Sequence, residues 1–166
     1  MKRRAALASA VAACLAGCGP APSARARPKL PAMQVRDLSG APRTVQGAAG
    51  KPQVINMWAL WCPPCRAELP ALERLADALA PQGFSVSAIA LAADLFPVRE
   101  YLAQYAARLP GAVLAPGTPV VEQLGLDALP QTFLVDPEGG VIAAWVGARD
   151  WDAPSVRTEL LNSFKA

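Results

Sequence analysis

The order of the predicted elements indicates an α/β fold, an α/β sandwich with one mixed sheet. Three observations support this prediction. Short apolar runs alternate along the chain with longer segments in which apolar residues recur at helical spacing. The last two runs flank a turn-forming Asp-Pro-Glu-Gly-Gly segment, which predicts an antiparallel pair. The chain has 166 residues, 53% of them hydrophobic, which suits the core of one ordinary domain.

Each element has its own local signal. Met33, Val35 and Leu38 alternate with polar residues before a Ser-Gly turn, which predicts a small N-terminal β-hairpin. Pro70 falls inside the longest helical pattern, where we expect it to kink the helix. The remaining predictions, in order, are a buried strand over 54–60, a helix over 63–80, a strand over 83–92, a helix from Asp94 through Leu109, a strand near 112–114, a short helix near 119–124, strands over 131–135 and 141–146, and a last helix capped by Asp152 or Ser155.

The N-terminus has the layout of a secretory signal. A basic trio precedes an apolar stretch over 5–16 that is too short to span a bilayer. It ends in Leu-Ala-Gly followed by Cys18, which resembles the bacterial lipobox. The resemblance implies a signal peptide over 1–17 and lipidation of Cys18. The alternative is an ordinary cleaved signal with a chance cysteine. Residues 18–30 are then the lipidated cysteine and a flexible tether, and residues 31–166 are the folded domain.

The charge of the chain argues against a nucleic-acid partner. The formal net charge is +3, but three of the sixteen basic residues lie in the predicted signal peptide. Removing them leaves 13 basic residues against 13 acidic ones. A neutral mature protein lacks the basic surface that attracts a phosphate backbone.

A strand that ends in a Cys-Pro-Pro-Cys sequence at residues 62–65 is the centre of the prediction. A thiol at the start of a helix is near the positive end of the helix dipole, which favours the thiolate. We expect Cys62 to be exposed and to attack a disulfide, and the more buried Cys65 to resolve the mixed disulfide. With Cys14 removed and Cys18 acylated, this pair has no structural disulfide framework around it and is therefore functional.

Half of a zinc site has the same Cys-X-X-Cys pattern. The chain has no histidine and no second cysteine pair after this one. A four-ligand site of nitrogen and sulfur atoms cannot be assembled within one subunit, so we expect no metal and favour redox chemistry.

Two segments carry a resemblance to a known family. Residues 58–65, Trp-Ala-Leu-Trp-Cys-Pro-Pro-Cys, resemble the thioredoxin fold and, more closely, the TlpA/ResA-like thiol–disulfide oxidoreductases of the bacterial envelope. Residues 129–136 have the form of the cis-proline loop and following strand of that family, and Pro70 matches its helix proline. The resemblance covers residues 31–166. It implies a thioredoxin-like three-layer sandwich with a central mixed sheet and an N-terminal β-hairpin.

The resemblance also implies roles for particular residues. Cys62 is the nucleophile and Cys65 the resolving thiol. Pro130 is cis and faces the disulfide, and the backbone of Leu129 is available to pair with a substrate strand. Trp61 either borders the site as an apolar docking surface or only packs.

Other residues near the motif receive less specific predictions. We expect Trp58 in the core. Asn56 stands where thioredoxin has a buried aspartate, so it cannot accept the proton of Cys65. At their spacing, Arg66 and Glu68 are explained equally well by a surface ion pair.

The function that the resemblance implies is that of a protein-disulfide reductase, lipid-anchored in the bacterial envelope and facing the periplasm or the outer face of the cytoplasmic membrane. Its substrates would be envelope proteins with a disulfide, such as apocytochrome c before haem attachment, the copper site of a respiratory oxidase or a partner thioredoxin. The sequence has no flavin or nicotinamide motif, so we expect no cofactor and a membrane thiol reductase as electron donor.

Three alternatives use the same cysteines. A disulfide-forming oxidase or isomerase remains open. A copper chaperone would use Cys62 and Cys65 as soft ligands, but chaperones of related fold space their cysteines by three residues and add a histidine. A peroxidase usually has a threonine three residues before its reactive cysteine, where this chain has Ala59.

Overall fold

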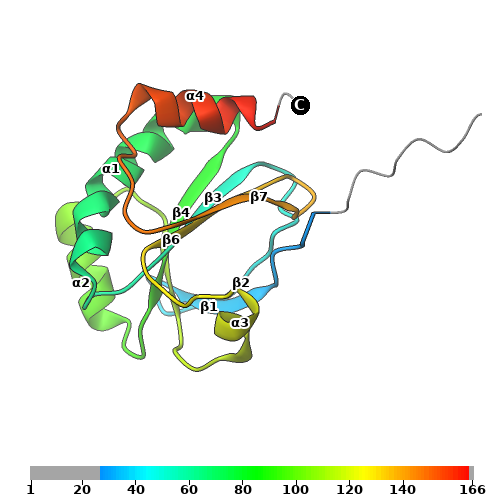
Figure 1. The fold of residues 1–166 in the computed structure, drawn as a ribbon. Helices are drawn as coiled ribbons and strands as arrows, with labels where there is room; N and C mark the ends of the chain where they lie inside the picture. Colours follow the sequence, from blue (N-terminus) through cyan, green and yellow to red (C-terminus); the bar gives the residue numbers. More distant parts are fainter. Residues whose placement is uncertain (1–26, 165–166) are drawn as a thin grey trace, which may run out of the picture.

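The computed structural model describes residues 27–164, and these fold around a seven-stranded mixed sheet with helices on both faces (Figure 1). The predicted three-layer α/β architecture is therefore confirmed. The elements are β1 (Met33–Asp37), β2 (Pro42–Val45), β3 (Gln53–Trp58), α1 (Pro63–Leu79) with a short 3-10 turn (Ala80–Gln82), β4 (Ser85–Leu91), α2 (Phe96–Tyr105), β5 (Gly111–Leu114), α3 (Pro119–Gln123), β6 (Gln131–Val135), β7 (Val141–Val146) and α4 (Pro154–Asn162).

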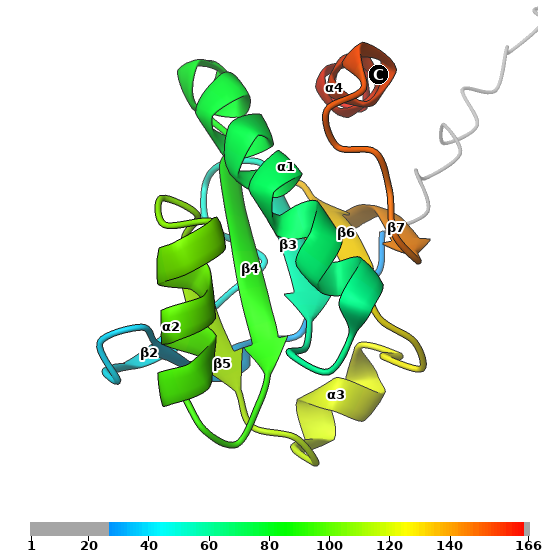
Figure 2. The ribbon, with the colours of Figure 1, turned by 90° about the vertical axis from the view of Figure 1, so that its left-hand side faces the viewer.

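The sheet has the strand order β2-β1-β5-β4-β3-β6-β7. The central strands β3, β4 and β5 are parallel and are joined by helices α1 and α2, while β6 and β7 form an antiparallel pair beside β3. The N-terminal hairpin β1–β2 is added antiparallel to β5. In Figure 2, α1 and α2 run along the strands that they connect.

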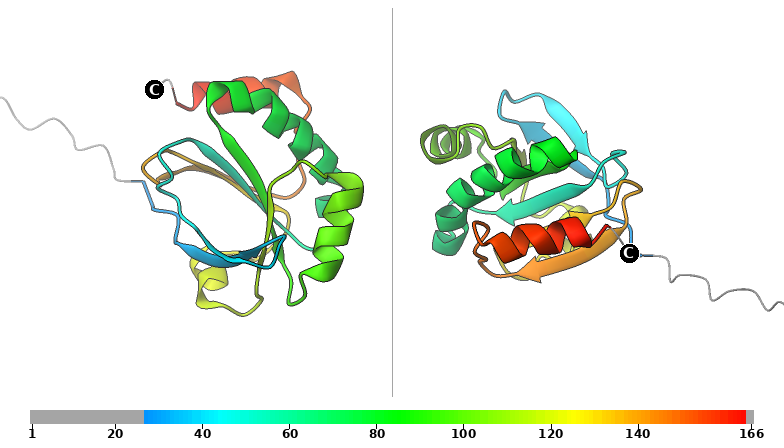
Figure 3. Two further views of the ribbon diagram at one scale, coloured as in Figure 1. Left: turned by 180° about the vertical axis from the view of Figure 1, so that it is seen from behind. Right: turned by 90° about the horizontal axis from the view of Figure 1, so that it is seen from above.

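Side chains from alternate positions of the sheet fill two apolar cores. Helices α1, α2 and α4 cover one face, where Val54, Trp58 and Leu134 are fully buried against Leu69 and Leu72. Strand β1 and helix α3 contribute to the core on the other face, around Ile55 and Met57. Figure 3 shows α4 beside α1 and above the β6–β7 ribbon. Burial of β3 on both faces explains why its sequence is continuously apolar instead of alternating.

The structure corrects several predicted element boundaries. Strand β3 ends at Trp58, because the chain turns there to reach α1. Helix α2 ends at Tyr105, four residues before the predicted end at Leu109, and its N-terminal amide at Phe96 donates a hydrogen bond to the Asp94 carboxylate at 3.0 Å. Leu109 is nevertheless buried, because the following turn packs it into the core. An apolar periodicity continues wherever the core is near, whether or not the backbone stays helical.

The predicted caps of the last helix are wrong. Helix α4 begins at Pro154 and its N-cap residue, Ala153, makes no side-chain hydrogen bond. Asp152 forms a bidentate pair with Arg74 of α1 at 2.6 and 2.9 Å, and Ser155 lies inside the helix. An oppositely charged partner from another element offers Asp152 a stronger hydrogen bond than a backbone amide does.

The packed part of the chain includes residues that the sequence places in the tether. The amide of Leu30 donates to Gly139 at 2.9 Å, and the carbonyl of Pro28 accepts from Val141 at 2.8 Å. The predicted signal peptide, Cys18 and most of the predicted tether lie outside the described residues.

Among the described residues, the helices are all too short or too polar to cross a bilayer.

Candidate active site

The cysteine pair lies where β3 passes into α1. A turn in which the Cys62 amide donates to the Ala59 carbonyl at 3.1 Å connects the two elements. Cys62 is the N-cap residue of α1, in extended conformation, and the helix begins at Pro63, whose missing N–H costs nothing at that position. Cys62 and Cys65 are joined by a disulfide, with their Cα atoms 5.3 Å apart.

Few backbone groups are directed at the sulfur of Cys62. The amide of Cys65 donates to it at 3.3 Å. Pro63 and Pro64 occupy the two positions between them and have no N–H to offer. The helix N-terminus therefore stabilises a Cys62 thiolate with its dipole and one amide instead of three.

The expected exposure of Cys62 is wrong for the disulfide form. Cys62 is 4% exposed and Cys65 is 0% exposed, so both are buried, although their order agrees with the prediction. The disulfide draws the Cys62 sulfur toward a fully buried partner. In this form neither cysteine is a free thiol, so neither can attack a substrate until the bond between the two sulfurs has been reduced.

The predicted proline loop lies at the same edge of the sheet as the cysteine pair. The Leu129–Pro130 peptide bond is cis, as predicted. The next residue, Gln131, is paired with Met57 near the end of β3, one residue before that strand ends at Trp58. Pro130 itself is buried and Leu129 is half-buried.

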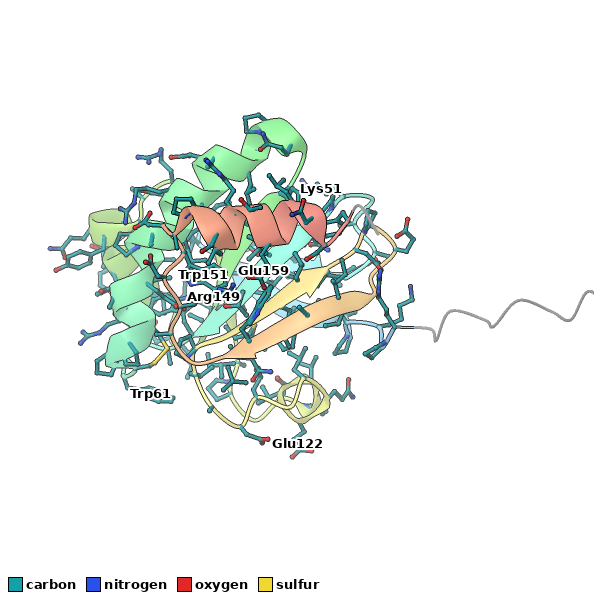
Figure 4. The ribbon with its side chains drawn as sticks, turned by 45° about the horizontal axis from the view of Figure 1, so that its top comes forward. Lys51, Trp61, Glu122, Arg149, Trp151 and Glu159 are labelled. Atoms are coloured by element: carbon teal, nitrogen blue, oxygen red, sulfur yellow. A yellow bond between two sulfur atoms is a disulfide. The ribbon has the colours of Figure 1, made fainter. Side chains whose placement is uncertain are left out.

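The two tryptophans before the cysteines have different environments. Trp61 is 74% exposed and projects away from the body of the domain (Figure 4). Trp58 is fully buried, with its ring centroid 5.9 Å from that of Tyr101 in α2. The core position predicted for Trp58 is confirmed. Trp61, directly before Cys62, does not pack into the core.

Glu68 is the polar residue whose environment the sequence did not reveal. It is 5% exposed, and the surface ion pair with Arg66 is absent from the described contacts. One carboxylate oxygen, Oε1, accepts from Asn56 Nδ2 at 2.7 Å. The other, Oε2, accepts from Trp151 Nε1 at 2.9 Å and from the amide of Arg149 at 3.2 Å.

Two signals in the sequence point to this arrangement in retrospect. Glu68 lies three residues after Cys65 and four before Leu72, so it belongs to the buried stripe of α1. Asn56 is a polar residue in an otherwise apolar central strand, and a fully buried amide needs partners. Asn56 finds them in Glu68 and in the hydroxyl of Thr132, at 2.9 Å.

Burial raises the pKa of Glu68 above its ordinary value of 4.5, and the hydrogen bonds from Trp151, Arg149 and Asn56 offset only part of that rise. The carboxyl group can therefore hold a proton at a pH where an exposed glutamate has lost it. Side chains three residues apart on a helix are neighbours, so this proton-binding group lies one turn from Cys65.

The arrangement defines a class of protein. A cysteine pair lies at a helix N-terminus, at the same edge of the sheet as a cis-proline loop. Such a pair carries two electrons when it changes between the dithiol and the disulfide form. The molecule is a thiol–disulfide oxidoreductase of the thioredoxin fold.

Comparison with known proteins agrees with this class. The Redoxin family model matches residues 25–160, and the chain belongs to the Redoxin family. The chain is 28% identical to the thiol-disulfide oxidoreductase ResA of Bacillus thuringiensis (strain Al Hakam) over 117 residues, which are 70% of this chain and 67% of ResA. The ResA of Bacillus subtilis (strain 168) is 27% identical over 117 residues, 70% of this chain and 65% of its own.

A solved structure gives the same result. The crystal structure of a Chlorobium tepidum protein described as thiol:disulfide interchange protein DsbE superposes with a TM-score of 0.71 and 26% identity, covering 85% of this chain and 99% of that one. The protein is a ResA-like thiol–disulfide oxidoreductase.

Proposed function

We propose that this protein is a lipid-anchored reductase of disulfides in proteins of the bacterial envelope. The observation that carries the direction of the reaction is the poor stabilisation of the Cys62 sulfur, which receives one backbone hydrogen bond, from Cys65. A thiolate with few donors makes the dithiol form less favourable, so the protein gives up electrons readily.

The reaction proceeds in two exchange steps. In the dithiol form, the Cys62 thiolate attacks one sulfur of a substrate disulfide, forms a mixed disulfide and releases one substrate thiolate. The Cys65 thiol then loses its proton, attacks the Cys62 sulfur and releases the second substrate thiolate. Two electrons pass to the substrate, and the Cys62–Cys65 disulfide remains to be reduced by a membrane thiol reductase.

We assign to Glu68 the role of accepting the proton that Cys65 loses in this second step. Asn56 stands where thioredoxin has an aspartate, and it has no acid group of its own. Its Nδ2 donates a hydrogen bond to the carboxylate of Glu68 at 2.7 Å. A buried acid one helical turn from the resolving cysteine can take up the proton as the Cys65 thiolate forms, and pass it to solvent or to the departing thiolate.

The substrate-binding surface that we propose consists of Trp61, Leu129 and Pro130. The exposed indole of Trp61 offers apolar contact area. The backbone of Leu129 precedes the cis bond and is available to pair with an extended substrate segment. This surface would receive a partly unfolded polypeptide with an exposed disulfide, such as apocytochrome c or the copper-site domain of an oxidase.

The reduction potential tests the direction. We expect a value nearer to about −270 mV than to about −120 mV, because the prolines between the cysteines remove two donors from the thiolate. Equilibration of the pair with mixtures of reduced and oxidised dithiothreitol, read by alkylation of Cys62 and Cys65, measures it. A potential above roughly −180 mV, the value for protein disulfide isomerase, would contradict the reductase and support an oxidase or isomerase.

The lipid anchor is tested at Cys18. The Cys18→Ser precursor should remain unacylated and lack the mass of the acyl chains, because the serine has no thiol to modify. Mass spectrometry of both proteins after expression in a bacterium with the lipoprotein pathway measures the difference. A wild-type protein that begins at another residue and carries no lipid would contradict the anchor while leaving the redox function intact.

A further inference from the structure

We propose that Trp151 is a positioning residue for the resolving step: its indole N–H holds the Glu68 carboxylate ionised and in place to take the proton of Cys65. This inference rests on the proposed function of Glu68. It assigns a positioning role to the segment between β7 and α4, whose Trp151 is separated from Glu68 by 83 positions in the sequence.

The geometry around the carboxylate carries the inference. Trp151 is 2% exposed, and its Nε1 donates to Glu68 Oε2 at 2.9 Å. The same oxygen accepts the amide of Arg149 at 3.2 Å, and the other oxygen accepts from Asn56. Of the three donors, the indole is the one that comes from a side chain of the β7–α4 segment. Figure 4 shows Arg149 and Trp151 together between α4 and the sheet.

Neighbouring side chains fix the direction of the indole N–H. The rings of Trp151 and Trp145 meet edge to face, with centroids 6.1 Å apart and an interplanar angle of 82°. The guanidinium carbon of Arg149 lies 5.6 Å from the centroid of Trp151 and 4.6 Å from that of Trp145. Arg149 is held in turn by an ion pair with Glu159 of α4.

The other charged groups near Glu68 are largely compensated. Arg74 of α1 pairs with Asp152 of the β7–α4 segment at 2.6 Å, and the side chain of Arg149 pairs with Glu159. Asp150, from the same segment, accepts the amide of Asp152 at 3.1 Å. Cys65 lies one helical turn earlier on α1 and adds a thiol to these neighbours in the dithiol form. A single substitution can therefore remove the hydrogen bond of the indole from the carboxylate without changing the local charge.

Removing the indole N–H has a defined consequence. A hydrogen bond to a carboxylate favours its ionised form, so its loss raises the pKa of Glu68 further. At a pH between the old and the new pKa, Glu68 of the variant is already protonated and cannot take up the proton that Cys65 must lose. Trp151→Phe should therefore move the pH dependence of the resolving step upward, by about one pH unit for a hydrogen bond to a charged group.

Single-turnover reduction of 5,5′-dithiobis(2-nitrobenzoate) separates the two steps. Attack by Cys62 releases the first nitrothiobenzoate, and attack by Cys65 on the mixed disulfide releases the second. We expect Trp151→Phe to shift the midpoint of the second phase upward by about one pH unit, and to slow it by up to about tenfold below the midpoint. The first phase should be unchanged. Trp145→Phe is the matched control, because it keeps an aromatic ring against Trp151 and removes an indole that makes no hydrogen bond to Glu68 among the described contacts; it should retain the wild-type midpoint.

A double-variant cycle shows whether Trp151 acts through Glu68. Glu68→Gln should abolish the pH midpoint of the second phase, and adding Trp151→Phe to Glu68→Gln should change that phase no further. An unshifted midpoint in Trp151→Phe, or an equal shift in the Glu68→Gln background, would overturn the inference. With either of these two results, normal reduction of 5,5′-dithiobis(2-nitrobenzoate) by the wild-type protein would leave the proposed function intact. If the Cys62→Ser variant reduces it as well, the proposed function fails instead.

A measurement on the wild-type protein covers the case in which Trp151→Phe does not fold. With nitrogen-15-labelled tryptophan, the indole resonance of Trp151 should titrate with the same midpoint as the second phase, and that of Trp145 should not. Glu68→Gln should remove the titration. An indole resonance of Trp151 that ignores pH across this midpoint would overturn the inference without any substitution at Trp151.

Discussion

Cys65→Ser will turn the protein into a covalent trap, and Cys62→Ser will abolish disulfide reduction. With Cys65 removed, the Cys62 thiolate still attacks a substrate disulfide, but nothing within the protein resolves the product. With Cys62 removed, the remaining thiol is the one that is 0% exposed and lies inside the first turn of α1, where a substrate disulfide cannot reach it. Turnover should fall to the uncatalysed level in both variants.

The two variants are compared by non-reducing electrophoresis and mass spectrometry after expression in the bacterial envelope. Cys65→Ser should accumulate mixed disulfides that dithiothreitol releases, and their partners identify the substrates. Cys62→Ser and the double serine variant are the controls and should show few or none. If Cys62→Ser traps as much as Cys65→Ser, or if alkylation of the reduced protein labels Cys65 before Cys62, the two roles are reversed.

Glu68→Leu will destabilise the fold more than Glu68→Gln, by about 2 kcal/mol. Both substitutions remove the buried charge at nearly constant volume. Glutamine keeps an oxygen that can accept from Asn56 or from Trp151. Leucine leaves the buried indole N–H of Trp151 and the partly buried amide of Arg149 without this acceptor, and leaves Asn56 with Thr132 alone. Each orphaned donor costs about 1–3 kcal/mol. Urea unfolding of the disulfide form at pH 7, followed by tryptophan fluorescence, measures the difference, and equal midpoints and slopes for the two variants would contradict it.

The same variants test the pKa of Glu68 through the pH dependence of stability. Because the folded pKa of Glu68 is raised above its unfolded value, the folded state binds the proton more tightly. The stabilisation from this group is complete below the unfolded value of about 4.5 and is lost as the pH rises through the folded pKa. Wild type should therefore lose unfolding free energy relative to Glu68→Gln as the pH rises through this window, by about 1.4 kcal/mol per unit of difference between the two pKa values.

Glu73→Gln provides the matched control for this titration. Glu73 lies on the same helix, but its carboxylate faces Arg108, at 3.2 Å, and not the Glu68 site. The stability of Glu73→Gln over the same pH range shows what the loss of an α1 glutamate outside the Glu68 site does. A Glu68→Gln profile parallel to that of wild type at every pH would show that the pKa of Glu68 is the same in the folded and unfolded states.

Much of the fold could be predicted from the sequence because its signals are local. The turn residues at 136–140 and the apolar runs on either side determine β6 and β7, whose bounds agree with the prediction at both ends. Pro63 at a helix start and the cysteines around it identify the redox pair, and the structure joins Cys62 and Cys65 in a disulfide. The positions of helix ends were less predictable, because Leu109 is buried beyond the end of α2 and continues its apolar period.

The sequence by itself therefore determined the cysteine pair and the order of strands and helices, since each depends on residues that are adjacent or regularly spaced. The cis-proline loop was predicted from the family resemblance, because the residues around Pro130 alone would indicate an ordinary trans bond. Only the tertiary structure decided the environment of Glu68. Its partners Asn56, Arg149 and Trp151 lie 12, 81 and 83 positions away and come from the sheet and from the segment before α4. The spacing of Glu68 in α1 places it on the buried stripe of the helix, but it does not show which donors the carboxylate meets there. The desolvation of the carboxylate and the donors that compensate it exist only when the layers are packed.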